Sequence, residues 1–337
     1  MFKIKFTNTY ETIISLCNLL EAWREFERGK RQRKDVQLFK RNLITNIISL
    51  HQDLKQKSYT HGHYHSFNIS DPKPRNIHKA TVRDRLLHHA IYRQLYPFFD
   101  KTFISDSFSC RKFKGTHKAL KRFQIFANKV SKNDTKTFWV LKCDVKRFFD
   151  SIDHQILLSI LKEYVVDREI ILLLERIISS FHKNRLGKGL PLGNLTSQLF
   201  VNIYLNKFDQ FVKHKLKANY YVRYADDFVI MSGDKQWLEE VLSKTKEFLH
   251  TELRLELHPN KVKIQTLSSG VDFLGWVHFS KHRVLRTTTK KRMFRNIELK
   301  ERKLEVVQAY LGLLSHGNGR RLRGEIKKWI KQDHSVS

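Results

Sequence analysis

The sequence predicts an α+β protein, and three observations support this fold class. Near the N-terminus, apolar residues recur every three or four positions, as on one face of a helix; they are Ile13, Leu16, Leu19, Leu20 and Trp23, then Leu43, Ile47, Leu50 and Leu54. In the middle of the chain, short β-branched and aromatic runs alternate with turn residues, which is typical of strands. Helical spacing returns near the C-terminus, at Met293, Ile297, Leu304, Val307, Leu311 and Leu314. We therefore expect a helical N-terminal extension over residues 1–66, a mixed region over 67–280 and a helical region over 281–337.

The charge balance indicates the kind of partner. The 337 residues include 64 Lys and Arg against 33 Asp and Glu, a formal net charge of +31. This excess favours a polyanion, and nucleic acid is the first candidate. Residues 1–10 lack a signal-peptide core and no apolar stretch is long enough for a membrane span, so we expect a soluble cytoplasmic protein. Three widely separated cysteines argue against a disulfide framework and a four-ligand zinc site.

A dense basic run lies between the two predicted N-terminal helical stretches. Residues 24–41 include Arg28, Lys30 and Arg31. Such a run is usually a solvated helix face, but in a chain this basic we favour contact with phosphates. Residues 61–65 then hold three histidines without Cys or acidic neighbours, which favours a polar loop over a metal site.

An extended segment broken by prolines follows at residues 67–77, before a predicted helix over 81–96. Lys73 and Arg75 alternate toward one side of it. Basic side chains in this arrangement can clamp a triphosphate, and ordinary surface charge is the alternative.

Residues 106–120 combine aromatic side chains with Arg111, Lys112 and Lys114 before a helix begins. Stacking surfaces beside phosphate-binding groups suit a template strand. The alternative is a helix N-terminus preceded by a glycine turn.

Acidic residues stand at the ends of two strand runs. Residues 138–144 end on Asp144, and residues 221–231 form two short strands joined by a tight turn that carries Asp226 and Asp227. Phosphoryl transfer uses two magnesium ions about 4 Å apart, which prefer oxygen ligands. Asp144 and Asp226 would bridge the ions, with the Val145 carbonyl as a further ligand and Asp227 as a third acid. An isolated acidic turn is usually only a solvated hairpin, but the flanking strands and the second acid favour a metal site.

A glycine-rich loop, residues 187–198, lies between the two acidic runs and leads into a helix over 195–217. Glycines let backbone approach a ligand, and a helix N-terminus favours anions. Further strands are expected over 257–264 and 271–279, where they would close the sheet.

Beyond these strands the chain becomes strongly basic. Residues 281–303 hold ten Lys or Arg against two Glu. With apolar residues at helical spacing, this predicts helices with one packed face and another that contacts a duplex backbone, through Lys290, Lys291, Arg292 and Arg295.

This order of features resembles that of reverse transcriptases, from about Asn18 to about Trp329. The residues that carry the resemblance are Tyr224-Ala225-Asp226-Asp227, Asp144 with Phe148-Phe149-Asp150, and Phe273-Leu274-Gly275-Trp276. The resemblance implies a right-hand polymerase with fingers, palm and helical thumb, two Mg²⁺ ions and deoxynucleoside triphosphate substrates. It also implies that Phe149 excludes a ribose 2′-hydroxyl, that Lys73 and Arg75 clamp the triphosphate and that Lys261 lies near the nucleotide.

The glycine loop indicates a subgroup. Many reverse transcriptases have Gln after the loop proline and end with Ser-Pro, whereas this chain has Leu192, Gly193 and then Ser197-Gln198. In this it resembles the enzymes of diversity-generating retroelements, which copy a template-repeat RNA with frequent errors at adenines. An aliphatic side chain in place of an amide removes a hydrogen bond beside the nucleotide, so weaker base discrimination is expected. The resemblance also implies a bacterial or phage origin and a basic accessory variability protein as partner.

Two other interpretations remain open. A group II intron-like or retron-like reverse transcriptase would share the chemistry but use a different RNA. A non-catalytic RNA-binding or defence protein would keep the fold alone, although two carboxylates that repel each other are readily lost when they have no use.

Overall fold

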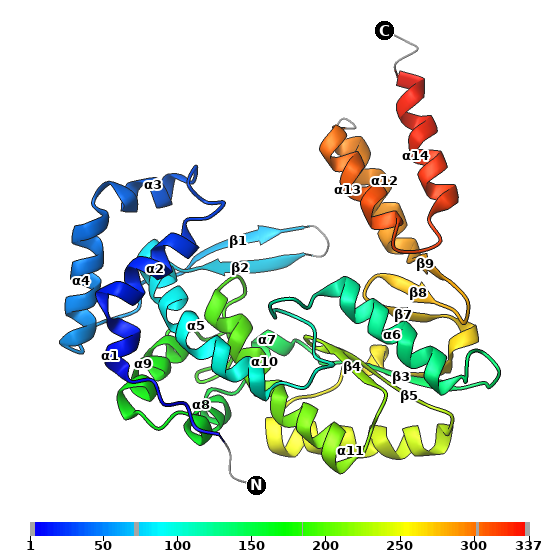
Figure 1. The fold of residues 1–337 in the computed structure, drawn as a ribbon, viewed down its shortest axis with the longest axis horizontal. Coiled ribbons are helices and arrows are strands. Elements are labelled where there is room, and N and C mark those ends of the chain that lie inside the picture. Colours follow the sequence, from blue (N-terminus) through cyan, green and yellow to red (C-terminus); the bar gives the residue numbers. More distant parts are fainter. Residues whose placement is uncertain (1–3, 71–73, 184, 301–302, 334–337) are drawn as a thin grey trace. The chain divides into compact units, whose positions relative to one another are not determined.

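The computed structural model describes residues 4–70, 74–183, 185–300 and 303–333 (Figure 1). Its contacts divide the chain into two compact units, each assembled from three stretches of sequence. The first unit takes Met1–Ser105, Val145–Leu216 and Thr245–Leu257; the second takes Asp106–Asp144, Lys217–Lys244 and His258–Ser337. Within the described residues, no helix is both long enough and apolar enough to cross a membrane.

The first unit is mainly helical. Its elements are α1 (Tyr10–Ile14), α2 (Leu16–Phe26), α3 (Lys34–Arg41), α4 (Leu43–Lys55), β1 (His65–Ile69), β2 (Arg75–Lys79), α5 (Val82–Thr102), α7 (Phe148–Ser151), α8 (His154–Tyr164), α9 (Arg168–Ser179), α10 (Leu195–Gln210) with a π-helical turn η1 (Phe211–Lys215), and residues 245–253 of α11 (Lys235–Leu253). Helix α5 is its central element and packs against both α2 and α10. It runs past the predicted end at residue 96, even though Pro97 lies inside it, because its apolar face stays buried through Phe99.

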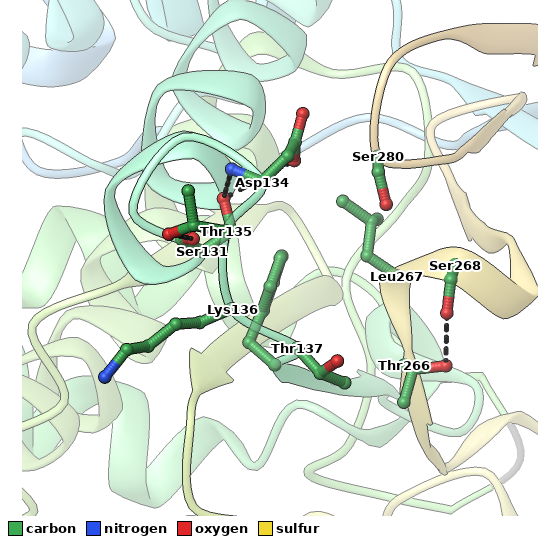
Figure 2. A pocket seen from close by; sticks show the side chains of 10 residues that line it. Ser131, Asp134, Thr135, Lys136, Thr137, Thr266, Leu267, Ser268 and Ser280 are labelled. Atoms are coloured by element: carbon green, nitrogen blue, oxygen red, sulfur yellow. Dashed lines mark hydrogen bonds between the residues drawn. The ribbon is translucent and has the colours of Figure 1, made fainter.

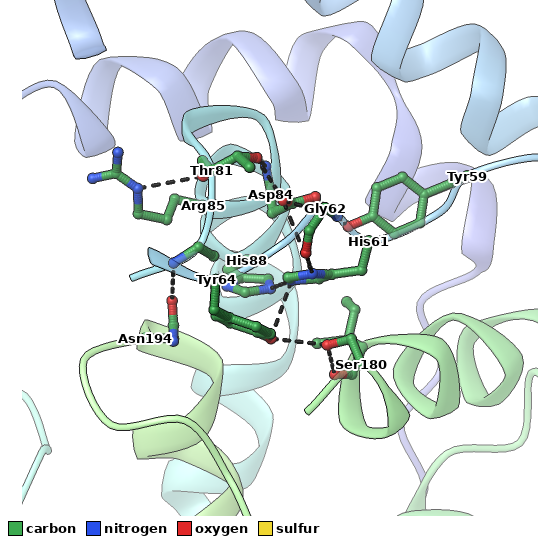
Figure 3. A network of polar contacts seen from close by, with 12 residues as sticks. Tyr59, His61, Gly62, Tyr64, Thr81, Asp84, Arg85, His88, Ser180 and Asn194 are labelled. Atoms are coloured by element: carbon green, nitrogen blue, oxygen red, sulfur yellow. Dashed lines mark hydrogen bonds and ion pairs between the residues drawn. The ribbon is translucent and has the colours of Figure 1, made fainter. Parts of the chain in front are cut away.

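A buried polar network joins the start of α5 to the segment before β1 (Figure 3). Asp84 is 1% exposed and accepts hydrogen bonds from the Tyr59 hydroxyl at 2.8 Å and the Gly62 amide at 3.2 Å. The His61 side chain lies in the same network, with its Nε2 3.3 Å from that of His88. Residues 61–64 form a loop, as predicted, in which these partners enclose the His61 ring and His63 is exposed, while His65 begins β1.

The second unit contains a four-stranded antiparallel sheet in the order β4-β5-β3-β6. The strands are β3 (Trp139–Asp144), β4 (Tyr221–Tyr224), β5 (Asp227–Ser232) and β6 (Lys263–Thr266). Helix α6 (Thr116–Val130) shares a hydrophobic core with this sheet, through Leu120 and Phe123 among others. The strand expected over 257–264 begins only at Lys263, because Pro259–Lys261 forms a 3₁₀ turn, η2, and proline has no amide to donate to a strand ladder.

A separate three-stranded sheet, β7-β8-β9, follows a short 3₁₀ turn, η3 (Leu267–Ser269). Its strands are β7 (Val271–Phe273), β8 (Trp276–His278) and β9 (Arg283–Leu285). The single strand expected over 271–279 is in fact two strands, because Leu274 and Gly275 turn the chain with φ of 52° and 84°. These strands form a sheet of their own instead of closing the first one. Helices α12 (Thr287–Leu299), α13 (Leu304–Leu314) and α14 (Arg320–Asp333) complete the unit, as the basic C-terminal sequence predicts.

Candidate active site

The strand register of the second unit brings two of the three acids together. Strands β3 and β5 are antiparallel, and their last pair places Asp144 opposite Asp227. Strand β4 pairs with the other edge of β5, and Ala225 and Asp226 form the turn between them. Residues more than eighty positions apart therefore present carboxylates at one end of the sheet, as the strand-end acids predict.

The turn has an unusual backbone, and Arg223 supports it. Ala225 has a φ of 54°, in the left-handed region that costs a residue with a side chain about 1 kcal/mol. The Arg223 side chain, 1% exposed, donates from Nη1 to the Ala225 carbonyl and from Nη2 to the Ser107 hydroxyl, both at 3.0 Å. A buried cation thus holds the carbonyl that immediately precedes Asp226. Sequence reasoning missed Arg223, although an arginine inside a buried strand is itself a sign of a specific partner.

Two lysines approach the acids. Lys261 on η2 donates to Asp144 Oδ1 at 2.8 Å, and Lys142 Nζ lies 3.8 Å from Asp227 Oδ2. The family resemblance predicts Lys261 near a nucleotide; in the structure it contacts an acid of the site. Lys142 was not anticipated, yet it stands two residues before Asp144 in one strand, and alternation places both side chains on the same face.

Asp227 is half-buried, and its carboxylate has a strongly shifted pKa. Burial raises its pKa to about 7; the Lys142 ammonium opposes this rise, and the carboxylates of Asp144, Asp226 and Asp272 add to it. Its Oδ1 is buried and has no hydrogen-bond partner among the described residues. The site therefore concentrates negative charge that the protein only partly neutralises.

The three acids, Asp144, Asp226 and Asp227, provide the kind of ligands that magnesium usually has when it binds beside a phosphate substrate. Within the described ranges, no three His, Cys, Asp or Glu side chains converge closely enough to hold an ion by themselves. Magnesium beside a nucleotide commonly takes only one or two protein carboxylates and completes its shell with phosphate and water oxygens. Asp144 and Asp227 face each other and Asp226 is their neighbour, so carboxylate oxygens are available, including the buried Oδ1 without a partner. The Val145 carbonyl stays a predicted ligand; Val145 begins the next stretch of the first unit and its side chain is 2% exposed.

Several predicted nucleotide-binding residues lie in the first unit, around β2. Arg75 is exposed at the start of β2. The glycine loop lies along the same strand, because the Leu192 carbonyl accepts from the His78 amide at 3.0 Å. Gly193 has a φ of 105°, and a Cβ there would lie 2.8 Å from Ile77 Cγ2, so glycine is required. The loop and the extended segment, over a hundred residues apart in sequence, thus form one surface.

Three further predicted nucleotide contacts have different surroundings. Gln198 is half-buried in the first turn of α10. Phe149 lies in α7, its ring 5.7 Å from that of Phe148, and its carbonyl accepts from the Leu190 amide at 2.8 Å, so it too adjoins the glycine loop. Lys73 lies outside the described residues.

The predicted nucleic-acid contacts of the N-terminal run are only partly exposed. Arg28 and Arg31 are exposed after α2, and Arg31 pairs with Glu27 at 3.2 Å. Lys30 donates to the Phe26 carbonyl at 2.7 Å, and burial lowers its pKa. Its ammonium therefore also caps the end of α2.

The loop before α6 presents a large aromatic ring among cations. Phe113 is 87% exposed with a φ of 60°, and it stands between Lys112 and Lys114. Arg111 donates to the Ser107 carbonyl at 3.0 Å, which fixes the base of the loop. An exposed ring flanked by positive charge is suited to stacking on a base.

Helix α12 has the expected two faces. Met293 and Ile297 are fully buried, whereas Lys291 and Arg295 are exposed. Lys290 and Arg292 are half-buried beside the apolar face.

The small polar pocket drawn in Figure 2 is a different feature of the second unit. It has a volume of about 140 Å³ and is lined mainly by hydroxyl groups, including those of Ser131, Thr135 and Ser268. None of the three acids lines it.

Comparison with known proteins agrees with this geometry. The chain is 25% identical over 258 residues to protein YkfC of Escherichia coli, covering 66% of each chain. It is 26% identical over 276 residues to the group II intron-encoded protein LtrA of Lactococcus lactis, covering 60% of this chain but only 44% of that protein. A telomerase from Candida albicans, solved with a fragment of telomeric RNA, has a similar fold, with a TM-score of 0.51 and 12% identity over 73% of this chain and 52% of that one.

The sequence profile of one family matches residues 68–278, which include β2 to β8 and all three acids. The chain therefore belongs to the reverse transcriptase (RNA-dependent DNA polymerase) family.

Proposed function

We propose that this chain synthesises DNA on an RNA template, with Asp144, Asp226 and Asp227 as the catalytic acids. The observation that carries the proposal is the pairing of Asp144 with Asp227 across β3 and β5, next to a turn that presents Asp226. Membership of the family makes divalent metal ions and an RNA template the expected cofactor and partner.

The chemistry is nucleotidyl transfer. The 3′-hydroxyl oxygen of a primer forms a bond to the α-phosphorus of a deoxynucleoside triphosphate, the bond to the β-phosphate oxygen breaks, and pyrophosphate leaves. The hydroxyl proton is lost to solvent. Bound magnesium would stabilise the charge that develops on the oxygens; the role of the chain's carboxylates is to bind and orient it.

We further propose the right-hand arrangement in which residues 67–280 form fingers and palm and residues 281–337 form the thumb. The surface made by Arg75, Leu192 and Gly193 would receive the nucleotide, with Lys73, Phe149 and Gln198 beside it. The exposed face of α12 would follow the duplex backbone, as its basic residues favour.

Primer extension tests the activity. Wild-type protein with magnesium, an RNA template and a DNA primer should extend the primer, and Asp226→Asn should lower the rate by ~10³-fold, because it removes a charged ligand of the site. Glu239→Gln is the matched control, since Glu239 is an exposed acid that pairs only with Lys235 among the described residues. Equal extension by wild type and Asp226→Asn would refute the assignment.

For the biological role we propose a diversity-generating retroelement enzyme, which copies a template-repeat RNA into adenine-mutagenised cDNA with a basic accessory variability protein. Support comes from Leu192 and Gln198 in the glycine loop, where the resemblance to that subgroup lies. Sequencing of the cDNA tests the role: errors should concentrate at template adenines and decrease in Leu192→Gln. Errors spread evenly over the four bases would contradict it.

A group II intron-like enzyme is the second candidate, and the similarity to LtrA supports it. Such an enzyme would have no adenine bias, and Leu192→Gln would leave its error spectrum unchanged. The same sequencing experiment therefore separates the two roles.

A further inference from the structure

A basic pocket of about 550 Å³ lies in the second unit, and none of the three acids lines it. Its walls come from α6, from the turn between β8 and β9 with the start of β9, and from the turn between α13 and α14. Its volume is within the range of ordinary ligand sites.

The charged side chains of the lining are all positive. Lys118 and Lys121 on α6 and Lys281 before β9 are exposed, and Arg283 on β9 is half-buried. No acidic residue is among the residues that line the pocket. Lys118 Nζ donates to the Phe113 carbonyl at 2.6 Å, which leaves its charge uncompensated. Four cations around one hollow repel each other, and a bound anion would relieve that repulsion.

One wall is held rigidly in place. The Arg283 carbonyl accepts from the Asn318 amide at 2.9 Å, and its Nε donates to the His316 carbonyl. The Arg283 guanidinium also lies 5.6 Å from the centre of the Trp276 ring. Gly317 packs so closely on this ring that a Cβ would lie 2.2 Å from it. This wall is therefore formed before any ligand arrives, which lowers the entropy lost on binding.

Two stacked histidines are among the residues that line the pocket. The rings of His117 and His316 are stacked with their centres 3.7 Å apart. Burial lowers the pKa of His316, and His117 and Arg283 lower it further. The other titratable groups that line the pocket are Lys118, Lys121, Lys281, His282 and Arg283, all basic. A bound phosphate would be the first negative group to face the pair, and it would favour their protonated forms.

We infer that this pocket binds a backbone phosphate of an RNA strand at a position separate from the catalytic acids, an inference that rests on the proposed function for the identity of the strand. The phosphate oxygens accept from the lysines and Arg283, while the stacked imidazoles add charge-assisted contacts below neutral pH. Free nucleotides carry the same chemical group, so the experiment has to separate the two sources.

The first arm measures affinity. Fluorescence anisotropy of a labelled twelve-nucleotide single-stranded RNA, with EDTA present, compares the full-length protein with the double variant Lys118→Gln, Lys121→Gln. We expect binding on the order of tenfold weaker and a smaller salt dependence, as for lost phosphate contacts. The matched control is Lys162→Gln, Lys246→Gln, which removes the same charge at exposed positions on α8 and α11. Equal losses in the two double variants would overturn the inference.

The second arm uses pH, since lysines alone cannot respond near neutrality. From pH 8 to pH 6, wild-type affinity for the RNA should rise on the order of threefold through linkage to the histidine pair. His117→Gln, His316→Gln should show a flatter pH profile. An unchanged profile would contradict the role of the pair.

The third arm identifies the source of the phosphate. If dATP displaces the RNA from wild type at lower concentration than unlabelled RNA does, the pocket is a free-nucleotide site and the RNA assignment is overturned. Primer extension is measured separately. A wild-type protein that binds RNA through the pocket but extends no primer would refute the proposed activity and leave this inference intact.

Discussion

Asp84 in the first unit is a buried carboxylate, Asp227 in the second is half-buried with one buried oxygen, and their surroundings are opposite. Asp84 accepts from the Tyr59 hydroxyl and the Gly62 amide, and Thr81 donates to it as well. Asp227 has a buried Oδ1 without a hydrogen-bond partner in the described part of the chain, and its pKa is raised to about 7 by burial. A carboxylate matched by donors stabilises the fold, whereas one that the protein leaves unmatched lowers stability and is available to a ligand.

The largest effect on stability is expected at Asp84. Asp84→Asn keeps the shape of the side chain but replaces one carboxylate oxygen by an amide NH2 group, which cannot accept a hydrogen bond. At least one of the donors from Tyr59, Gly62 and Thr81 therefore loses its acceptor. We expect a loss of about 3 kcal/mol in the free energy of unfolding, measured by urea denaturation. Asp53→Asn is the control, because Asp53 is 41% exposed in its pair with Arg83 and should change stability by under about 1 kcal/mol. Equal shifts in both variants would break the comparison.

Arg223 supports the turn that carries Asp226, and its loss should affect the reaction more than the stability. Arg223→Met removes the hydrogen bond to the Ala225 carbonyl, so the turn that carries Asp226 can relax. We expect the rate of primer extension to fall by ~10²-fold, equivalent to about 3 kcal/mol in the barrier. The concentration of magnesium for half-maximal rate should rise as well. Arg223→Lys should recover part of the rate; a rate in Arg223→Met equal to wild type would exclude a positioning role.

Asp227→Asn should stabilise the protein measured in EDTA. The folded pKa of Asp227 lies above its unfolded value, so the folded state binds the proton more tightly. The ionised side chain therefore destabilises the fold progressively as pH rises from about 4 to about 7. Asparagine removes this penalty, and we expect a gain of about 2 kcal/mol at pH 8 and about a third of that at pH 5. Thermal unfolding at the two pH values measures it. A gain that is larger at pH 5 would show that the charge of Asp227 is not the cause.

The smallest effect is expected at the edge of the Asp84 network. The Tyr64 hydroxyl lies 2.8 Å from Ser180 Oγ and 3.3 Å from His61 Nε2. Tyr64→Phe removes both contacts and leaves the ring, so we expect a loss of about 1 kcal/mol. Calorimetry of this variant beside Tyr64→Leu separates the hydroxyl from the packing, and a change as large as that of Asp84→Asn would show that the hydroxyl, not the carboxylate, is the centre of the network.

The fold class and the candidate catalytic acids can be predicted from short sequence patterns. The α+β class and the three acids follow from short patterns, because helical periodicity, strand alternation and turn residues are properties of neighbouring positions. The family profile confirms the reverse transcriptase resemblance that these motifs carry. Two expected strands, over residues 257–264 and 271–279, differ from the structure because they contain turns that an apolar run does not reveal.

Contacts between distant residues were decided only by the tertiary structure. Antiparallel register, not sequence spacing, placed Asp144 opposite Asp227 and brought Lys261 to Asp144. The tertiary structure also decided three other contacts between distant residues: the glycine loop along β2, the donors around Asp84 and the stacked pair of His117 and His316. A segment's propensity is fixed by its own side chains, but the partner of a strand edge or of a buried polar atom depends on which distant segment the folded chain brings beside it.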